Sequence, residues 1–460
     1  MGDQDHGSVQ DAVAKENKQS ANNNGQRFDF ITETIKKKPV NKKRLFLKLI
    51  STVLFAVLFG AVACLTYLLL FPIMQAKLNP QETREVVLPE EEPADTEADP
   101  GAVSTEEVEV TPAAEEKPKE VVTQVVQKVE KVEKTLDVTD YKQLYSQISR
   151  VASDVRKSLV TVTGIYPDTD WFQNPYEQNR ATSGLLVADN GKEVLIIAQT
   201  EAIRQAESVL VTFCDNSEHE ATVKKSDSST GLTVVAVDID SLSEETKEKI
   251  TMAKLGSSRI STLVGSPIIA LGNPIGISGS MESGQITSNS YVKTIADSGI
   301  QFLTTDIYGS EAASGVLVNL DGEVLGIIYQ DENVGDAPNL IRAYGISDLR
   351  GKIEKLSNGQ DLAYLGIYGT DVTEAAAREL GIPNGVYVKE VLIGSPAMEA
   401  GIQNGDVIVK IGTAEINSFE TFKDTMLKCQ PGDLMMISLQ RQGRFDYTEL
   451  SYEITLGTLE

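Results

Sequence analysis

Two short apolar runs on either side of an Asp-Gly pair constrain the fold of this 460-residue chain more than any other feature. The runs are GVLVN at 315–319 and EVLGII at 323–328, and Asp321-Gly322 separates them. Because Asp-Gly pairs adopt the tight turns that join antiparallel strands, this stretch predicts a β-hairpin with a small-residue loop in front of it.

Many further β-rich runs, separated by turn signals, occupy residues 141–355. Examples are SGLLVA, EVLIIA, SVLVTF and SPIIALG, with a turn signal at Asn190-Gly191. Regular short strands of this kind predict an all-β barrel or sandwich rather than βαβ units. A polar joint at Lys355–Asp361 precedes a second compact module at 362–457.

The first 71 residues predict a membrane anchor. Residues 1–48 read as a disordered tail that ends in seven basic residues within Lys36–Lys48, and Leu49–Phe71 carries no charge. Twenty-three uncharged residues are enough for one helix to span a bilayer. Because the basic cluster precedes the span, the tail is expected in the cytoplasm and the later domains outside the cell membrane. A cleaved signal peptide is the competing reading, but the run and its leader are too long for one.

Residues 72–140 read as an extracellular linker. Within 78–116 there are thirteen acidic residues and one basic residue, Arg84, so an extended, self-repelling spacer is expected. Valines and a leucine then repeat at 3-4-3-4 spacing from Val122 to Leu136, as in a coiled coil. Only about two heptads are present, so a plain helical or valine-rich spacer remains the alternative to a short oligomerising helix.

Composition excludes several functions. The net charge of −25 argues against nucleic acid as a partner. The three cysteines (Cys64, Cys214 and Cys429) are too far apart to indicate a metal site or a disulfide framework, and no metal or cofactor is expected. The chain has two histidines, His6 and His219, which limits every mechanism that needs an imidazole.

Several strings resemble the HtrA family of trypsin-like serine proteases. They are TSGLL at 182–186 with Asn190-Gly191, VGSPIIALGNPIG at 264–276, GQIT at 284–287 and the 315–328 hairpin. The resemblance implies a mostly β, chymotrypsin-like double β-barrel over 141–355. In 362–457, YLGI at 364–367, GSPA at 394–397 and AGIQNGDVI at 400–408 resemble a PDZ domain, which implies an α+β module.

The resemblance aligns the three catalytic positions with residues that cannot carry out acyl transfer. Aligned on these motifs, the histidine position carries Glu201, the aspartate position Gly231 and the serine position Ala313. Acyl transfer needs a hydroxyl, an imidazole that takes its proton and a carboxylate that orients the imidazole. Glu311 replaces the family's glycine two residues before the serine, and its carboxylate would oppose charge in the oxyanion hole.

A rearranged site is the alternative, with Ser314 as the sole candidate nucleophile. His219 is expected on a strand well past the base position, as an ordinary surface histidine. Lys224 and Lys225 are conceivable bases, but solvated lysines stay protonated. The sequence therefore predicts a pseudoprotease and leaves activity open.

The PDZ resemblance implies a second function. Such domains add a C-terminal peptide as a strand, and backbone N–H groups of a loop receive its carboxylate. The loop is assigned to Tyr364, Leu365, Gly366 and Ile367, although Tyr364 and Ile367 are equally well read as core residues. A helix from Asn417 to Cys429, capped by Asn417, is expected to flank the peptide groove.

The predicted function is therefore a membrane-anchored, inactive HtrA-like homologue that binds extracellular peptides or protein C-termini and supports protein quality control at the cell surface. It would scaffold or regulate an active protease by hetero-assembly, or form a homo-oligomer, for which trimers are usual in the family. The first alternative is an active serine endopeptidase with a rearranged site. The second is a purely architectural role in oligomerisation.

Overall fold

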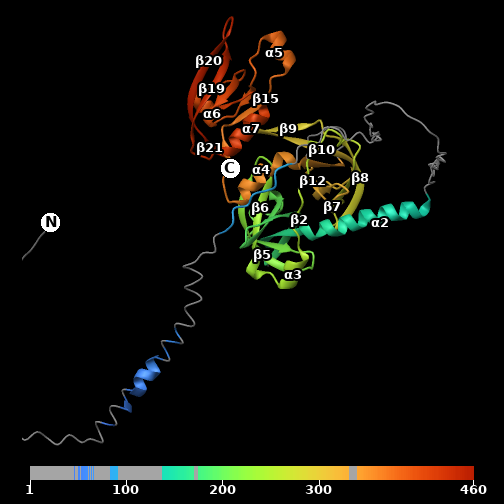
Figure 1. The fold of residues 1–460 in the computed structure, drawn as a ribbon, viewed down its shortest axis with the longest axis vertical. Coiled ribbons are helices and arrows are strands. Elements are labelled where there is room, and N and C mark those ends of the chain that lie inside the picture. The colour runs from blue at the N-terminus through green and yellow to red at the C-terminus, as the bar shows by residue number, and fades with distance from the viewer. Residues whose placement is uncertain are drawn as a thin grey trace, which may run out of the picture. The chain divides into compact units, whose positions relative to one another are not determined.

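The computed structural model describes residues 46, 50–51, 53–60, 62, 64, 66, 83–91, 137–169, 175–330 and 339–459 (Figure 1). These residues belong to two compact units, Met1–Pro80 and Gln81–Glu460, and each unit is considered by itself.

The first unit contains helical residues at 53–60, where Phe55 and Phe59 are strongly exposed. Over the described part of the chain, no helix combines the length and the apolar character needed to cross a membrane. The predicted span Leu49–Phe71 is described only in part. The predicted tail, apart from residue 46, and the heptad segment at 122–136 lie outside the described residues.

Six strands of the second unit close into a barrel, as predicted, in the order β1-β2-β3-β6-β5-β4. The turn at Asn190-Gly191 joins β2 to β3, with Gly191 at φ +86°. The apolar side chains of β3 pack on both faces of the strand. Ile196 packs inside this barrel, whereas Leu195 and Ile197 pack in the core shared with the second sheet. The strands are β1 (Leu159–Thr169), β2 (Pro175–Asp189), β3 (Glu193–Gln199), β4 (Ser208–Thr212), β5 (Glu218–Asp227) and β6 (Leu232–Asp238).

A seven-stranded sheet follows in the order β13-β12-β11-β7-β8-β10-β9. Because β13 also pairs with β10, the sheet returns on itself and forms the second barrel. The predicted hairpin is β11–β12, where Gly322 has φ +80° and Asn319 Oδ1 accepts the N–H groups of Asp321 and Glu323. The strands are β7 (Pro267–Asn273), β8 (Ser280–Ser288), β9 (Val292–Ile295), β10 (Ser298–Tyr308), β11 (Ser314–Val318), β12 (Val324–Ile328) and β13 (Leu340–Gly345).

Two longer helices lie before and after the strands of the barrels. α4 (Ile346–Ser357) follows β13 and buries Leu349, Ile353 and Leu356 in the core shared by the barrels. α2 (Val138–Val155) begins with a capping box, in which Asp137 accepts the N–H groups of Thr139 and Asp140. The shorter helices are η1 (Arg156–Ser158), η2 (Thr200–Ala202), η3 (Ile239–Ser241) and α3 (Glu244–Lys249).

The linker prediction is wrong for residues 83–91, which pack on the barrels instead of forming a free spacer. Val86 and Leu88 are buried in the shared core, at 5% and 6% exposure. Asn358 binds the backbone of Val86 twice, accepting its N–H and donating to its carbonyl at 2.8 Å each. Val86 and Leu88 are therefore buried despite the acidic residues around them, whereas Val87 between them is exposed.

The PDZ module has its own core, and β15 lies at one edge of its five-stranded path β15-β16-β17-β19-β20. β14 pairs with β21, and β18 pairs with β17. The strands are β14 (Ala363–Tyr364), β15 (Ile367–Asp371), β16 (Val386–Val391), β17 (Val407–Ile411), β18 (Ala414–Glu415), β19 (Leu434–Gln442), β20 (Tyr447–Thr455) and β21 (Gly457–Thr458). The helices are α5 (Glu374–Leu380), α6 (Pro396–Ala400) and α7 (Phe419–Lys428).

The predicted cap of α7 is wrong by one residue. Ser418, not Asn417, is the N-cap, and its Oγ accepts the N–H of Thr421 at 3.1 Å. Phe422 and Met426 face the PDZ core. Asn417 instead accepts the hydroxyl of Thr421 at 3.1 Å.

Candidate functional site

The predicted base and acid positions lie in one open cavity of about 490 Å³ at the end of β3. Glu201, from η2, and Gly231, directly before β6, both line it. The ring of Tyr329 lies over Gly231, 3.4 Å from where a Cβ would stand. The fold therefore brings Glu201 and Gly231 together at one cavity.

The third position, Ala313, does not line this cavity but is hydrogen-bonded to a residue that does. Gln199, which lines the cavity, donates through Nε2 to the carbonyls of Ile328 at 3.0 Å and Ala313 at 3.5 Å. The side chain of Ala313 is a buried methyl group at 2% exposure and offers no nucleophile.

The loop before β11 occupies one N–H group that an oxyanion hole would need. In serine hydrolases, the N–H of the nucleophilic residue is one donor to the oxyanion. Here the N–H of Ala313 donates to the carbonyl of Ser310 at 3.0 Å, and that of Ala312 donates to Ser310 Oγ at 3.2 Å. Glu311 is exposed, so the turn at 310–313, rather than the Glu311 carboxylate, occupies the donor of Ala313.

Ser314, the alternative nucleophile, is buried at 1% exposure. Its Oγ accepts the backbone N–H of Ser183 in β2 at 3.1 Å. The hydroxyl therefore helps to hold β11 against the first barrel.

The alternative bases make other contacts. His219, on β5, lies 3.5 Å from Ser241 Oγ through Nδ1 and packs edge-on against Phe213. Lys224 forms an ion pair with Glu193 at 2.8 Å, and Lys225 forms one with Asp361 at 2.6 Å. Both lysines are therefore paired with carboxylates of other segments.

In the predicted carboxylate loop, the side chains of Leu365 and Ile367 are fully buried in the PDZ core, whereas Tyr364 is half-buried. Gly366 has φ +90°, and a Cβ there would stand 2.2 Å from the Cβ of Ser395. Gly366 is therefore required both by its backbone conformation and by the close approach of Ser395.

Sequence reasoning missed the residue that fills this loop. The Asp297 carboxylate accepts the N–H groups of Leu365 at 2.7 Å, and of Gly366 and Ile367 at 2.9 Å each. Burial raises the pKa of Asp297 to about 6, although these three hydrogen bonds oppose the shift. The ADSG stretch at 296–299 signals only a turn between strands, and nothing in it indicates a partner about 70 residues later.

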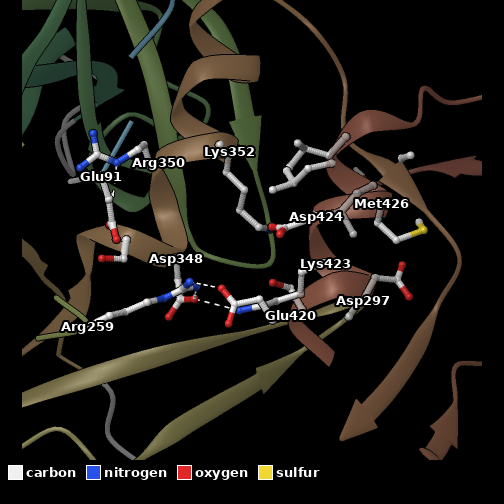
Figure 2. A pocket seen from close by; sticks show the side chains of 18 of the residues that line it. Glu91, Arg259, Asp297, Asp348, Arg350, Lys352, Glu420, Lys423, Asp424 and Met426 are labelled. Atoms are coloured by element: carbon white, nitrogen blue, oxygen red, sulfur yellow. Dashed lines mark hydrogen bonds and ion pairs between the residues drawn. The ribbon is translucent and has the colours of Figure 1, made fainter. Parts of the chain in front are cut away.

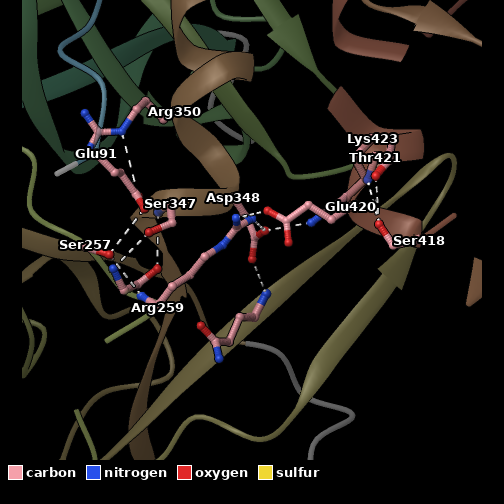
Figure 3. Close-up of polar contacts among 12 residues, drawn as sticks. Glu91, Ser257, Arg259, Ser347, Asp348, Arg350, Ser418, Glu420, Thr421 and Lys423 are labelled. Atoms are coloured by element: carbon pink, nitrogen blue, oxygen red, sulfur yellow. Dashed lines mark hydrogen bonds and ion pairs between the residues drawn. The ribbon is translucent and has the colours of Figure 1, made fainter. Parts of the chain in front are cut away.

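A second carboxylate, Asp348 of α4, also links the second barrel to the PDZ module, through a polar cluster (Figure 3). Its oxygens meet Arg259 and Lys423 at 2.9 Å each and accept the N–H of Gln301 at 2.8 Å. Arg259 also pairs with Glu420 of α7. The cluster borders a pocket that Asp297 also lines (Figure 2).

Two family models match the chain: the trypsin-like peptidase domain over residues 182–327 and the PDZ domain over residues 363–454. The periplasmic pH-dependent serine endoprotease DegQ of Escherichia coli is 28% identical over 296 residues, which cover 60% of this chain and 59% of that protein. The serine protease Do-like HtrA of Bacillus subtilis is 25% identical over 343 residues, covering 68% of this chain and 74% of that protein.

A probable DegP-like periplasmic serine endoprotease of Rickettsia prowazekii is 31% identical over 50% of this chain, which spans 44% of that protein. Among solved structures, the HtrA-type protease AlgW with a decapeptide has a TM-score of 0.48 at 19% identity, covering 68% of this chain and 98% of that one. The matched part of this chain covers about half the length of the first curated relatives, the Escherichia coli and Rickettsia prowazekii proteins.

Proposed function

We propose that this chain, a trypsin-like domain followed by a PDZ domain and related to HtrA-type serine proteases, is a catalytically silent homologue that binds protein C-termini. One observation supports the proposal. Glu201 and Gly231, which the motifs align with the base and the acid, line one cavity, and Ala313, aligned with the nucleophile, has a buried methyl side chain and is joined to that cavity through Gln199.

The chemistry explains why the cavity would not cut peptides. Hydrolysis by acyl transfer requires a nucleophile, and removing triad members leaves only the contribution of the oxyanion hole and binding, roughly 10³–10⁴-fold over water. In this loop the N–H of Ala313 is already hydrogen-bonded to Ser310. Even that residual contribution would therefore need the turn at 310–313 to rearrange.

The PDZ module offers a binding chemistry that needs no triad. β15 is an edge strand, so an extended peptide can add to it, and the loop at 364–367 presents three N–H groups that already bind one carboxylate. Protein or peptide C-termini are therefore the proposed ligands.

We further propose that the chain is anchored in the cell membrane by residues 49–71, with its barrels and PDZ domain outside. Two observations support the anchor: the uncharged run in the sequence and the exposed phenylalanines of the helical residues 53–60. At the cell surface, the protein would scaffold quality control by assembling with itself, for example as a trimer, or with an active protease.

Fluorophosphonate labelling and casein cleavage test the silent barrel, with the Bacillus subtilis HtrA relative assayed in parallel. The full-length chain should give neither labelling nor cleavage. Labelling that disappears in Ser314→Ala would instead assign activity to a rearranged site and overturn the proposal.

Peptide capture tests the second half. Peptides with free carboxyl ends should bind the full-length chain better than the same peptides with amidated ends, because only a carboxylate accepts three N–H groups. Equal binding of both forms would argue against recognition of C-termini.

A further inference from the structure

We propose that Asp297 is an internal ligand of the PDZ carboxylate loop, so that protein C-termini bind only by displacing it. This inference rests on the proposed function, because it concerns the regulation of the same loop. It is carried by the contacts of one turn of the second barrel, the turn between β9 and β10, with the edge strand of the PDZ sheet.

The backbone of Asp297 contacts β15 in the way an added peptide would. Its N–H donates to the carbonyl of Ile367 at 2.9 Å. In strand addition, the last residue of the ligand must satisfy the free backbone groups of the edge strand while its carboxylate occupies the loop. Asp297 does both, with its side-chain carboxylate in place of a terminal one.

The Asp297 carboxylate accepts all three backbone N–H groups of the loop, those of residues 365–367. One oxygen accepts the N–H groups of Gly366 and Ile367 at 2.9 Å, and the other accepts those of Leu365 at 2.7 Å and Gly366 at 2.9 Å. Asp297 is itself 7% exposed, so the loop is sealed from solvent. A second carboxylate cannot bind the same three donors, and occupation by Asp297 and by a C-terminus exclude each other.

The hairpin is held so that this residue points into the loop. Asp297 has φ +55°, a left-handed conformation that aspartate adopts more readily than most residues. Ser298 pairs with Ile295 directly after the turn. A Cβ built on Gly299 would stand 3.3 Å from the ring of Phe419, so β10 lies close against the start of α7 beside the groove. The β9–β10 turn therefore covers the carboxylate end of the groove.

Neighbouring ion pairs brace the closed arrangement. Lys423 and Glu420 of α7 bind Asp348 and Arg259, which belong to α4 and to the segment before β7 (Figure 3). Asp297 lies at the border of the pocket that these residues line (Figure 2). Opening the loop thus requires separating the β9–β10 turn from β15, against contacts that extend beyond Asp297.

The consequence for ligand binding is quantitative. When a site is competent only in a fraction of molecules, the apparent dissociation constant rises by the inverse of that fraction. Removing the internal carboxylate should therefore tighten the binding of free C-termini by at least about tenfold.

The test uses the full-length chain and a fluorescent hexapeptide library in two forms, with free and with amidated carboxyl ends. Asp297→Ala and the isosteric Asp297→Asn are compared with wild type. Asp306→Asn is the matched control, because Asp306 also accepts a backbone N–H, that of Gln285, but lies on the exposed side of β10. Tighter binding of free ends to both Asp297 variants, with the control at the wild-type level, supports the proposal. Equal affinity in wild type and Asp297→Ala overturns it.

Hydrogen exchange at the N–H groups of residues 365–367 provides a readout that needs no peptide. These groups should exchange slowly in wild type and faster in Asp297→Ala, while the amides of β17 stay unchanged. Unaltered protection in the variant overturns the proposal. Faster exchange without peptide binding by any variant would keep Asp297 as the internal ligand and reject the proposed capture of C-termini. If Asp297→Ala does not fold, Asp297→Asn carries the same comparison.

Discussion

Lys423 of α7 and Asp348 of α4 form a partly buried ion pair, with Nζ and Oδ1 2.9 Å apart. Burial by itself would raise the pKa of Asp348, but attraction to Lys423 and the N–H of Gln301 outweigh it, and the pKa lies below its ordinary value. Asp348 is therefore charged in the native state and joins α4, α7 and β10.

Removing that charge should destabilise the protein. Asp348→Asn leaves Lys423 and Arg259 without this carboxylate partner. The loss of unfolding free energy should be about 1–3 kcal/mol, between the values for exposed and for buried pairs. Because the native pKa of Asp348 is depressed, this contribution is full above the unfolded pKa and is lost as pH falls through the native value. Urea unfolding should thus separate variant from wild type at pH 7 and much less under strongly acidic conditions. Asp424→Asn, an exposed position on the same helix, should match wild type at both.

Asp297 gives a pH dependence of the opposite sign. Its native pKa of about 6 lies above the ordinary value of 3.8, so the closed loop binds a proton more strongly than the open one. Closure is strongest below the open-state pKa, weakens as pH rises towards 6 and then stays constant, a total change of about 3 kcal/mol. The charged and titratable groups around Asp297 include Lys352 of α4 and Tyr364 of β14. Those in the adjoining pocket are Glu90, Glu91, Arg259, Asp348, Arg350, Glu420, Lys423 and Asp424.

Hydrogen exchange of residues 365–367 between pH 4 and 8, corrected for the intrinsic exchange rates, measures this closure. Protection should decrease across the lower part of the range in wild type. In Asp297→Asn, which cannot ionise, the corrected protection should not vary with pH. A wild-type profile that is flat over the range would contradict the assignment of the titration to Asp297.

Gly366→Ala should damage the loop more than its backbone conformation alone explains. At φ +90° an alanine is strained by about 1–2 kcal/mol, and its Cβ would also collide with Ser395 at 2.2 Å. Gly359, at φ +69°, has no atom within 4 Å of a built Cβ, so Gly359→Ala reports the strain without the collision. Unfolding free energies should fall further for Gly366→Ala, with loss of C-terminal peptide binding. Equal losses would mean that Ser395 can move aside.

Ser314→Ala should affect stability and leave hydrolysis unchanged. Without Oγ, the N–H of Ser183 loses its acceptor in a buried position, which costs about 1–3 kcal/mol. Urea unfolding checks the loss, and casein cleavage checks that neither protein is active. Ser290→Ala, at an exposed position, should be neutral. An unchanged unfolding free energy in Ser314→Ala would show that Ser314 does not serve as this acceptor.

Asn358→Ala should release residues 83–91 from the barrels. The amide of Asn358 makes two hydrogen bonds with the backbone of Val86, and each contributes about 1 kcal/mol. Limited digestion with trypsin should then cut after Arg84 about tenfold faster, by population of the open state. Asn404→Ala removes a comparable amide contact with the N–H of Val391 and is the control. A rate equal to wild type would mean that Val86 and Leu88 alone hold the segment.

Local patterns in the sequence were enough to predict the strands and their turns. Asn190-Gly191 and Asp321-Gly322 each bring glycine to a positive φ between apolar runs, and both hairpins formed as expected. The assignment of Glu201, Gly231 and Ala313 to the triad positions rests on motif spacing and stays a prediction. The packing of residues 83–91 could not be predicted. Their composition is acidic, and the residues that bury Val86 and Leu88 lie far away in the chain.

By itself, then, the sequence determined the two β-barrels and the PDZ module, because each depends on patterns among neighbours in the chain. Only the tertiary structure decided that Asp297 fills the loop at 365–367 and that the N–H of Ala313 is bound by Ser310. The physical reason is that backbone N–H groups are the same at every residue. Which acceptor each N–H group binds depends on how distant segments pack. Composition and motif spacing do not predict that packing.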